Sequence, residues 1–152
     1  ISVSSLFHDV GKCHTPDHIL NKPGKLTSEE YRYIMKHPIH TRILLEKHFG
    51  SQVAEIAEKH HERLDGSGYP YGLTEEDIGI EGRIIAVADT FDAMTTDRPY
   101  KAGKALQEAL EELEELAKNG LYDVEVVQAL RKLADKDLIH LQNSTTYENR
   151  QG

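Results

Sequence analysis

The chain has 152 residues, enough for one domain of ordinary size around a single core. Its 38% hydrophobic and 29% charged residues are typical of a soluble globular protein rather than a disordered one. No apolar run reaches the roughly 18 to 20 residues of a membrane span, and the first residues do not form a signal peptide. A formal charge of −8 disfavours binding to a nucleic-acid polymer, but it is compatible with a small anionic substrate held by metal ions.

Cysteine content and the first residue bear on cellular context. Cys13 is the only cysteine, so no intrachain disulfide is expected. We expect a cytoplasmic location, either for the whole protein or for the cytoplasmic domain of a membrane-bound signalling protein. The chain begins with Ile1 rather than Met, and we therefore expect it to be cut from a larger polypeptide.

Nearly every periodic segment has the helical period of about 3.6 residues, and no segment has a convincing strand pattern. The fold class predicted is therefore all-α, a helical bundle. Residues 1–7 are expected to be the last turns of a helix that ends near His8. Residues 10–26 contain two glycines and two prolines, and they are predicted to form a loop.

The next two helices have clear start signals. Thr27 and Glu30 have the spacing of a capping box, which predicts a helix from there to about Lys36. A further helix is predicted from His37, because the proline that follows is tolerated in a first turn. That helix should end at Gly50, since glycine is common just past a last turn.

The rest of the chain is expected to contain four helices and one short acidic element. The first of these helices should carry His60 and His61 in its last turn, and the second, mostly apolar, should be deeply buried. The expected elements are residues 52–62, the acidic element opened by Thr74, then 80–97, 103–118, and a last helix from its cap Asp123 to about Ala134. We expect residues 1–138 to form the folded core and residues 139–152 to be an unstructured tail.

Histidines and carboxylates are the candidate functional residues, because eight of the nine histidines fall within residues 8–61. Imidazoles and carboxylates are ligands for Mn, Fe, Zn or Ni. Adjacent ligands diverge by about 100° on a helix, so each pair suits two neighbouring ions better than one. Two ions about 3.5 to 4 Å apart activate a shared water and clamp both oxygens of a displacement at phosphorus. This pattern indicates phosphoester hydrolysis by the candidate ligands His8, Asp9, His37, His60, His61 and Asp89.

Each candidate also has a simpler interpretation. A His-Asp pair arises by chance in many proteins, and His37 fits an ordinary first helical turn. For Asp89 the functional interpretation is preferred, because a carboxylate inside the apolar stretch IIAVADTFDAM is costly unless it is paired or bound to a metal. Asp92, one turn later, could face the same cavity or make a hydrogen bond on the helix surface.

The cations and the remaining polar residues are weighed in the same way. Lys12 and Arg98 lie beside the candidate ligands, where they could hold a phosphate, although most single cations are merely solvated. Cys13 is either a reactive thiol or, preferably, a small loop residue. The role of His40 is left open, and a surface position is the preferred interpretation. The histidines assigned to surface or loop are His14, His18, His48 and His140.

Four motifs occur in order: HDVGK (8–12), KHP (36–38), HHERLDGSGYP (60–70) and ADTFDAMTTDRPY (88–100). Over about residues 4–134 the chain resembles the HD-GYP proteins, a branch of the HD-domain metal-dependent phosphohydrolases. The resemblance implies a bacterial signal-transduction hydrolase, often under two-component regulation. Its substrate would be the second messenger cyclic di-GMP, cleaved to pGpG and further to GMP.

The resemblance also implies roles for individual residues. The six candidates above would bind two or three divalent ions, Fe or Mn ahead of Ni, Zn or Mg, with Asp9 as the bridging ligand. Lys12 and Arg98 would contact the phosphate, and Asp92 would border the substrate. The turn Gly68-Tyr69-Pro70 would brace the lip of the site.

Two departures from the family are visible. The family draws a further Glu and His ligand from a helix upstream of the HD motif, whereas this chain starts seven residues before His8. We therefore expect an N-terminally truncated HD-domain bundle with an incomplete metal site and doubtful activity as it stands. The family usually has Gly four residues after the histidine of its His-Pro pair. This chain has Thr41, which should shift the helix packing there only modestly.

Alternatives to cyclic di-GMP hydrolysis remain at this stage. One is a binding module that senses the nucleotide, or docks a GGDEF-domain protein through its GYP loop, without turnover. Another is a phosphodiesterase for 3′,3′-cyclic GMP-AMP. A homodimer through apolar faces of the terminal helices is a further hypothesis.

Overall fold

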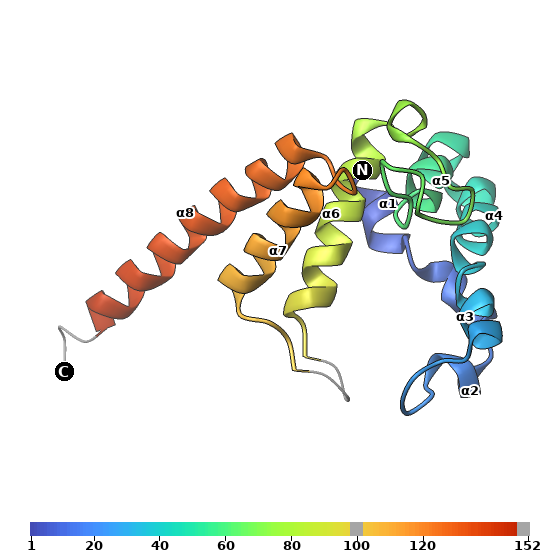
Figure 1. The fold of residues 1–152 in the computed structure, drawn as a ribbon, viewed down its shortest axis with the longest axis horizontal. Helices are drawn as coiled ribbons and strands as arrows, with labels where there is room; N and C mark the ends of the chain where they lie inside the picture. The colour runs from blue at the N-terminus through green and yellow to red at the C-terminus, as the bar shows by residue number, and fades with distance from the viewer. Residues whose placement is uncertain (98–101, 149–152) are drawn as a thin grey trace.

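The computed structural model describes residues 1–97 and 102–148, with side chains as far as residue 136. All named elements in these ranges are helices, and the one β-bridge is an isolated pair, Asp65 with Thr74. The predicted all-α class is therefore confirmed (Figure 1). The elements are α1 (Ser2–Phe7), η1 (Val10–His14), α2 (Asp17–Leu20), α3 (Ser28–Ile34), α4 (His37–Phe49), α5 (Ser51–Glu58), η2 (Glu75–Asp77), α6 (Ile80–Thr95), α7 (Leu106–Lys118) and α8 (Val124–Glu148).

The first half of the fold is built on a helical hairpin. Gly50, with φ at 84°, is the single residue between α4 and α5, and a positive φ is readily adopted only by glycine. Leu45, Ala54 and Ala57 form the small apolar core of this hairpin. The α1 helix packs on α5, and η1 packs on α4. This arrangement carries the segments around residues 8, 37 and 60 to one place.

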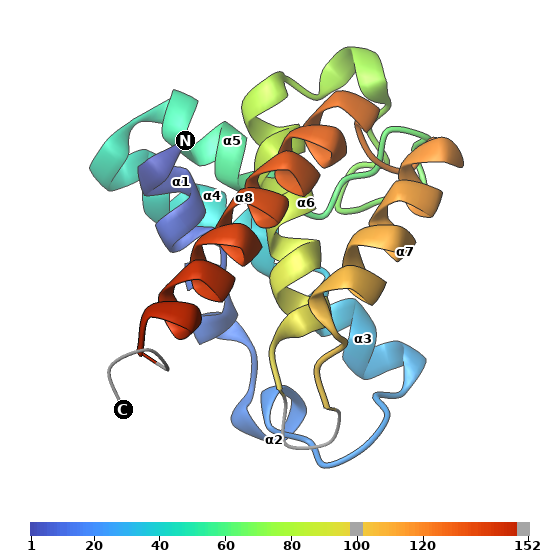
Figure 2. The ribbon, with the colours of Figure 1, turned by 90° about the vertical axis from the view of Figure 1, so that its left-hand side faces the viewer.

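The second half is a three-helix layer with the main apolar core. Helices α6, α7 and α8 bury side chains against one another, and α6 also contacts α5. Figure 1 shows α6 in the middle of the molecule, between α5 on one side and α7 and α8 on the other, and in Figure 2 α8 crosses in front of α6. The buried residues of this core are Ala86, Val87, Leu113, Ala117, Tyr122 and Val127.

The predicted helix signals behave as expected. The hydroxyl of Thr27 accepts a hydrogen bond from the Glu30 amide, and the Glu30 carboxylate accepts one from the Thr27 amide, which completes the capping box. The carboxylate of Asp123 accepts hydrogen bonds from the amides of Glu125 and Val126, and so caps α8.

Several predicted boundaries are wrong. The expected loop 10–26 contains the short helices η1 and α2. The helix expected to reach residue 62 ends at Glu58, so His60 and His61 lie in a turn beyond α5 rather than in its last turn. The last helix passes Ala134 and continues to Glu148, so the expected unstructured tail is helical that far. No glycine or proline interrupts residues 124–148, and nothing local ends the helix earlier.

The expected deep burial of the apolar helix is only partly right. Ile85, Ala86 and Val87 of α6 are buried, whereas Ile80 at its start is 52% exposed. Among the described residues no helix is both long and apolar enough to cross a membrane.

The core of the second half yields a stability prediction. Leu113 is completely buried, so Leu113→Ala should lower the free energy of unfolding by about 2–5 kcal/mol. Leu133→Ala removes the same atoms from a side chain that is 59% exposed, and it should change stability by no more than about 0.5 kcal/mol. Urea denaturation measures both variants, and equal losses would contradict the assignment of the core.

Candidate functional site

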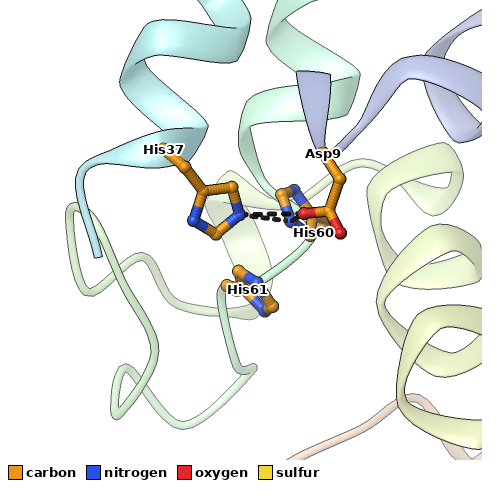
Figure 3. Close-up of side chains that lie close together, drawn as sticks. All are labelled: Asp9, His37, His60 and His61. Carbon is orange, nitrogen blue, oxygen red and sulfur yellow. Dashed lines mark hydrogen bonds and ion pairs between the residues drawn. The ribbon is translucent and has the colours of Figure 1, made fainter. Parts of the chain in front are cut away.

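The six predicted ligands come from four segments and converge. His8 follows α1, and Asp9 precedes η1. His37 is the first residue of α4, His60 and His61 lie just after α5, and Asp89 is on α6. Figure 3 shows His37, His60 and His61 around the carboxylate of Asp9. Ligand atoms of these four residues lie within 4.8 Å of one another, an arrangement that could hold a metal ion.

Backbone carbonyls fix the orientation of three of the imidazoles. The Nδ1 atoms of His8, His37 and His60 each lie 2.6 Å from the carbonyl oxygen three residues earlier, at Ser5, Ile34 and Ala57. A carbonyl oxygen only accepts hydrogen bonds, so each Nδ1 must carry the proton. In the neutral imidazole the lone pair is then on Nε2. Metal-binding histidines in proteins are typically held by such a hydrogen bond.

These lone pairs meet at Asp9. The Nε2 atoms of His37 and His60 are only 3.1 Å apart, and they lie 3.2 and 3.6 Å from Asp9 Oδ1. Two lone pairs cannot hydrogen-bond to each other, and Asp9 Oδ1 is buried without a hydrogen-bond partner. Three electron-rich atoms facing one another are stabilised by a cation between them, so the donor set fits a divalent metal.

The second carboxylate oxygen of Asp9 faces a different group. Asp9 Oδ2 lies 3.5 Å from His8 Nε2 and 2.5 Å from Lys12 Nζ. His8 Nε2 is also 3.3 Å from Asp89 Oδ1, and Asp89 Oδ2 is 3.8 Å from His61 Nδ1. The contact with Asp89 raises the pKa of His8. The two oxygens of Asp9 therefore point to two neighbouring clusters, as expected of a bridging carboxylate.

Burial prepares the histidines around Asp9 for a metal. Burial lowers the pKa of His60 and of His61, so both imidazoles are neutral near pH 7. Burial by itself would raise the pKa of Asp9, but contacts with His37, His60 and Lys12 outweigh it and hold that pKa well below its usual range. Neutral imidazoles beside an ionised carboxylate are the protonation states that a metal site needs.

The predicted substrate-contacting residues differ in position. Lys12 lies at the cluster through its contact with Asp9. Asp92 is exposed and accepts a hydrogen bond from the Thr96 hydroxyl at 3.2 Å, which is the helix-surface contact considered as its alternative. Arg98 lies outside the described residues. Its phosphate contact stays a prediction.

The GYP turn forms one wall of the site. The Tyr69 ring centroid is 4.7 Å from that of His61, and the Tyr69 amide donates to the His61 carbonyl at 3.2 Å. A side chain on Gly68 would meet the backbone of Arg63 at 2.4 Å, so only glycine fits this close approach. The bond between Tyr69 and Pro70 is cis.

Two buried glutamates support this wall, and the sequence did not reveal them. Glu62 is 1% exposed and accepts hydrogen bonds from the amides of Tyr71 and Leu73 at 2.8 and 2.9 Å. Glu58, also 1% exposed, accepts from the Tyr71 hydroxyl and from Arg42. Their partners lie 9 to 16 residues away in the sequence and are two backbone amides, a tyrosine hydroxyl and an arginine of α4. No local sequence pattern indicates contacts over such separations.

The other polar candidates lie at or near the surface. His14, His18 and His48 are exposed as predicted, and the side chain of His140 is outside the described part. His40 is half-buried with its ring 4.7 Å from that of His14. Cys13 is exposed.

Comparisons with known proteins agree with this geometry. The HD domain family matches residues 1–126. A cyclic di-GMP phosphodiesterase of Thermotoga maritima is 51% identical over 88% of the chain and 37% of its own length. A cyclic di-GMP phosphodiesterase of Pseudomonas aeruginosa is 44% identical over 86% of the chain and 31% of its length. A 3′3′-cGAMP-specific phosphodiesterase of Vibrio cholerae is 45% identical over 84% of the chain and 30% of its length.

The all-α fold with its histidine and aspartate cluster is thus that of an HD domain, a class that binds divalent metals. The chain belongs to the HD domain family and, with its HHERLDGSGYP motif, to the HD-GYP branch. It spans about a third of the length of the curated relatives described above.

The glutamate support yields a prediction. Glu62→Gln replaces one accepting oxygen with an NH2 group that faces a backbone N–H, so it should destabilise the protein by about 1–3 kcal/mol. Amide hydrogen exchange at Tyr71 and Leu73 should accelerate. Glu76→Gln, on an exposed residue of η2, is the matched control and should leave both unchanged. Unaltered exchange at Tyr71 in Glu62→Gln would contradict the assigned role.

Metal uptake tests the cluster directly. Mn²⁺ should raise the thermal midpoint of the wild-type chain, and a chelator should reverse the rise. Asp9→Asn removes the charge shared by both clusters with almost no change of shape, and should abolish most of the shift. Asp17→Asn, on an exposed residue of α2, is the control. An equal shift in Asp9→Asn would show that the ion binds elsewhere.

Proposed function

We propose that this chain is the catalytic core of a metal-dependent phosphodiesterase that hydrolyses cyclic di-GMP to pGpG and then GMP. The observation that carries the proposal is the meeting of two imidazole lone pairs and an unpartnered carboxylate oxygen at Asp9. The similarity to phosphodiesterases at 44–51% identity supports a cyclic dinucleotide as substrate.

The residues divide into two ligand groups. Asp9 Oδ1, His37 and His60 would hold one ion. Asp9 Oδ2, His8, His61 and Asp89 would hold the second, and a third ion would need ligands beyond this set. Fe or Mn suits this mixture of imidazoles and carboxylates, with Ni, Zn or Mg as alternatives. When bound, these ions supply a nucleophilic water near neutral pH and polarise the phosphate.

The chain's own side chains would do the remaining work. Asp9, shared between both groups, fixes their spacing and so the position of the reacting phosphate. The Lys12 ammonium, already beside Asp9, would bind a non-bridging phosphate oxygen and stabilise the charge that develops there. Tyr69, whose ring lies beside that of His61, would bound the site. The substrate contacts of Asp92 and Arg98 and the role of the Gly68-Tyr69-Pro70 lip complete the proposal.

A second candidate keeps the reaction and changes the substrate. Its support is the 45% identity to a 3′3′-cGAMP-specific phosphodiesterase, which makes 3′,3′-cyclic GMP-AMP a realistic substrate. A cytoplasmic signalling role, docking of a GGDEF-domain protein at the GYP loop and homodimer formation are further parts of the proposal. Nucleotide binding without turnover in metal-loaded protein would instead favour the sensor interpretation.

The assay is chromatographic. The chain is loaded anaerobically with Mn or Fe, its metal content is measured, and cyclic di-GMP and cyclic GMP-AMP are compared as substrates. Lys12→Met should keep the metal and lower kcat by about 10²–10³-fold, because it removes a donor to the developing charge. Lys25→Met, on an exposed lysine, should leave kcat unchanged. If metal-loaded protein cleaves neither nucleotide, both as this chain and in a longer form that carries the two expected upstream ligands, the proposal is refuted.

A further inference from the structure

One buried hydroxyl joins the segments that carry three of the candidate ligands. Thr41 is completely buried on α4, one turn after His37. Its hydroxyl donates a hydrogen bond to the His8 carbonyl and accepts one from the Gly11 amide, both at 2.9 Å. These two backbone groups lie on either side of Asp9. A single side chain therefore ties the turn around Asp9 to the helix turn that begins with His37.

The packing around this hydroxyl leaves no freedom for the turn to move toward α4. A side chain on Gly11 would meet the His37 carbonyl at 2.1 Å and the Thr41 amide at 2.5 Å. The turn therefore lies directly against the backbone of α4. Thr41 fills the remaining space with its hydroxyl directed at the turn. Across this contact, Asp9 Oδ1 lies 3.2 Å from His37 Nε2.

We propose that Thr41 is a positioning residue for the metal site, and that its hydroxyl sets the place of Asp9 relative to His37 and His60. The inference rests on the metal site of the proposed function, and it goes beyond that function. Thr41 is not itself a ligand. Its loss would leave all six ligands present but would allow the Asp9 turn to shift, and a metal site tolerates only small displacements of its ligands.

Three variants test this role. Thr41→Val keeps the shape and removes the hydroxyl, which leaves the Gly11 amide unsatisfied. It should raise the Kd for Mn²⁺ by about 10–100-fold. Thr41→Ser keeps the hydroxyl and should stay within about threefold of the wild type, whose metal Kd is measured by calorimetry on the same chain.

The matched control is Ser4→Ala. Ser4 is also completely buried, and its hydroxyl donates to the Val53 carbonyl at 3.0 Å, which joins α1 to α5 rather than α4 to the turn around Asp9. Ser4→Ala should lower the thermal midpoint of the metal-free protein much as Thr41→Val does, with Mn²⁺ affinity unchanged. Wild-type affinity in Thr41→Val, or an equal loss of affinity in Ser4→Ala, would overturn the assignment.

The outcome is separable from the proposed reaction, because the measured quantity is metal affinity. Wild-type protein that binds Mn²⁺ but cleaves no nucleotide would count against the phosphodiesterase activity alone. The role of Thr41 would still be decided by the Mn²⁺ affinities of Thr41→Val, Thr41→Ser and Ser4→Ala. Wild-type protein that binds no Mn²⁺ would overturn both.

Discussion

The site depends on three hydrogen bonds from histidine Nδ1 atoms to backbone carbonyls. Each commits one ring nitrogen of His8, His37 or His60 to the protein and leaves the other, a lone pair in the neutral ring, facing a carboxylate of the site. Two of these lone pairs meet at 3.1 Å beside an unpartnered carboxylate oxygen. In the absence of a cation this is an unfavourable arrangement, and the fold must hold it in place. The short helices around it and the buried contacts of Thr41 and Glu62 supply that restraint.

The fold supplies this restraint through short helices and buried hydrogen bonds that connect neighbouring segments. The α4–α5 hairpin carries His37 and the turn of His60 and His61, and η1 brings Asp9 onto α4. Buried polar side chains then fix the connecting backbone: Thr41 holds the turn before η1, and Glu62 holds the segment after the GYP turn. Such networks are valuable only when every member is satisfied. Each hydroxyl or carboxylate here meets a backbone donor or acceptor at hydrogen-bonding distance.

The sequence predicted the chemistry of the site better than its supports. The caps at Thr27 and Asp123 and the stop at Gly50 are local signals, and all three appear in the structure. The meeting of the six candidate ligands came from residue type and motif order. The place of Glu62 and the hydroxyl bridge of Thr41 could not be predicted, because their partners are backbone groups of other segments. The end of α5 at Glu58 was also missed, because apolar periodicity does not show where a helix gives way to a turn.

Because of the position of α6, the two proposed ion positions differ in which parts of the fold supply their ligands. Asp9, His37 and His60 all belong to the α1–α5 half, which is locked by the hairpin. Asp89 alone of the six residues stands on a helix whose other face is packed into the α7–α8 layer. The second ion would therefore lie between the α1–α5 half and the α6–α8 layer, and its affinity would respond to any tilt of α6.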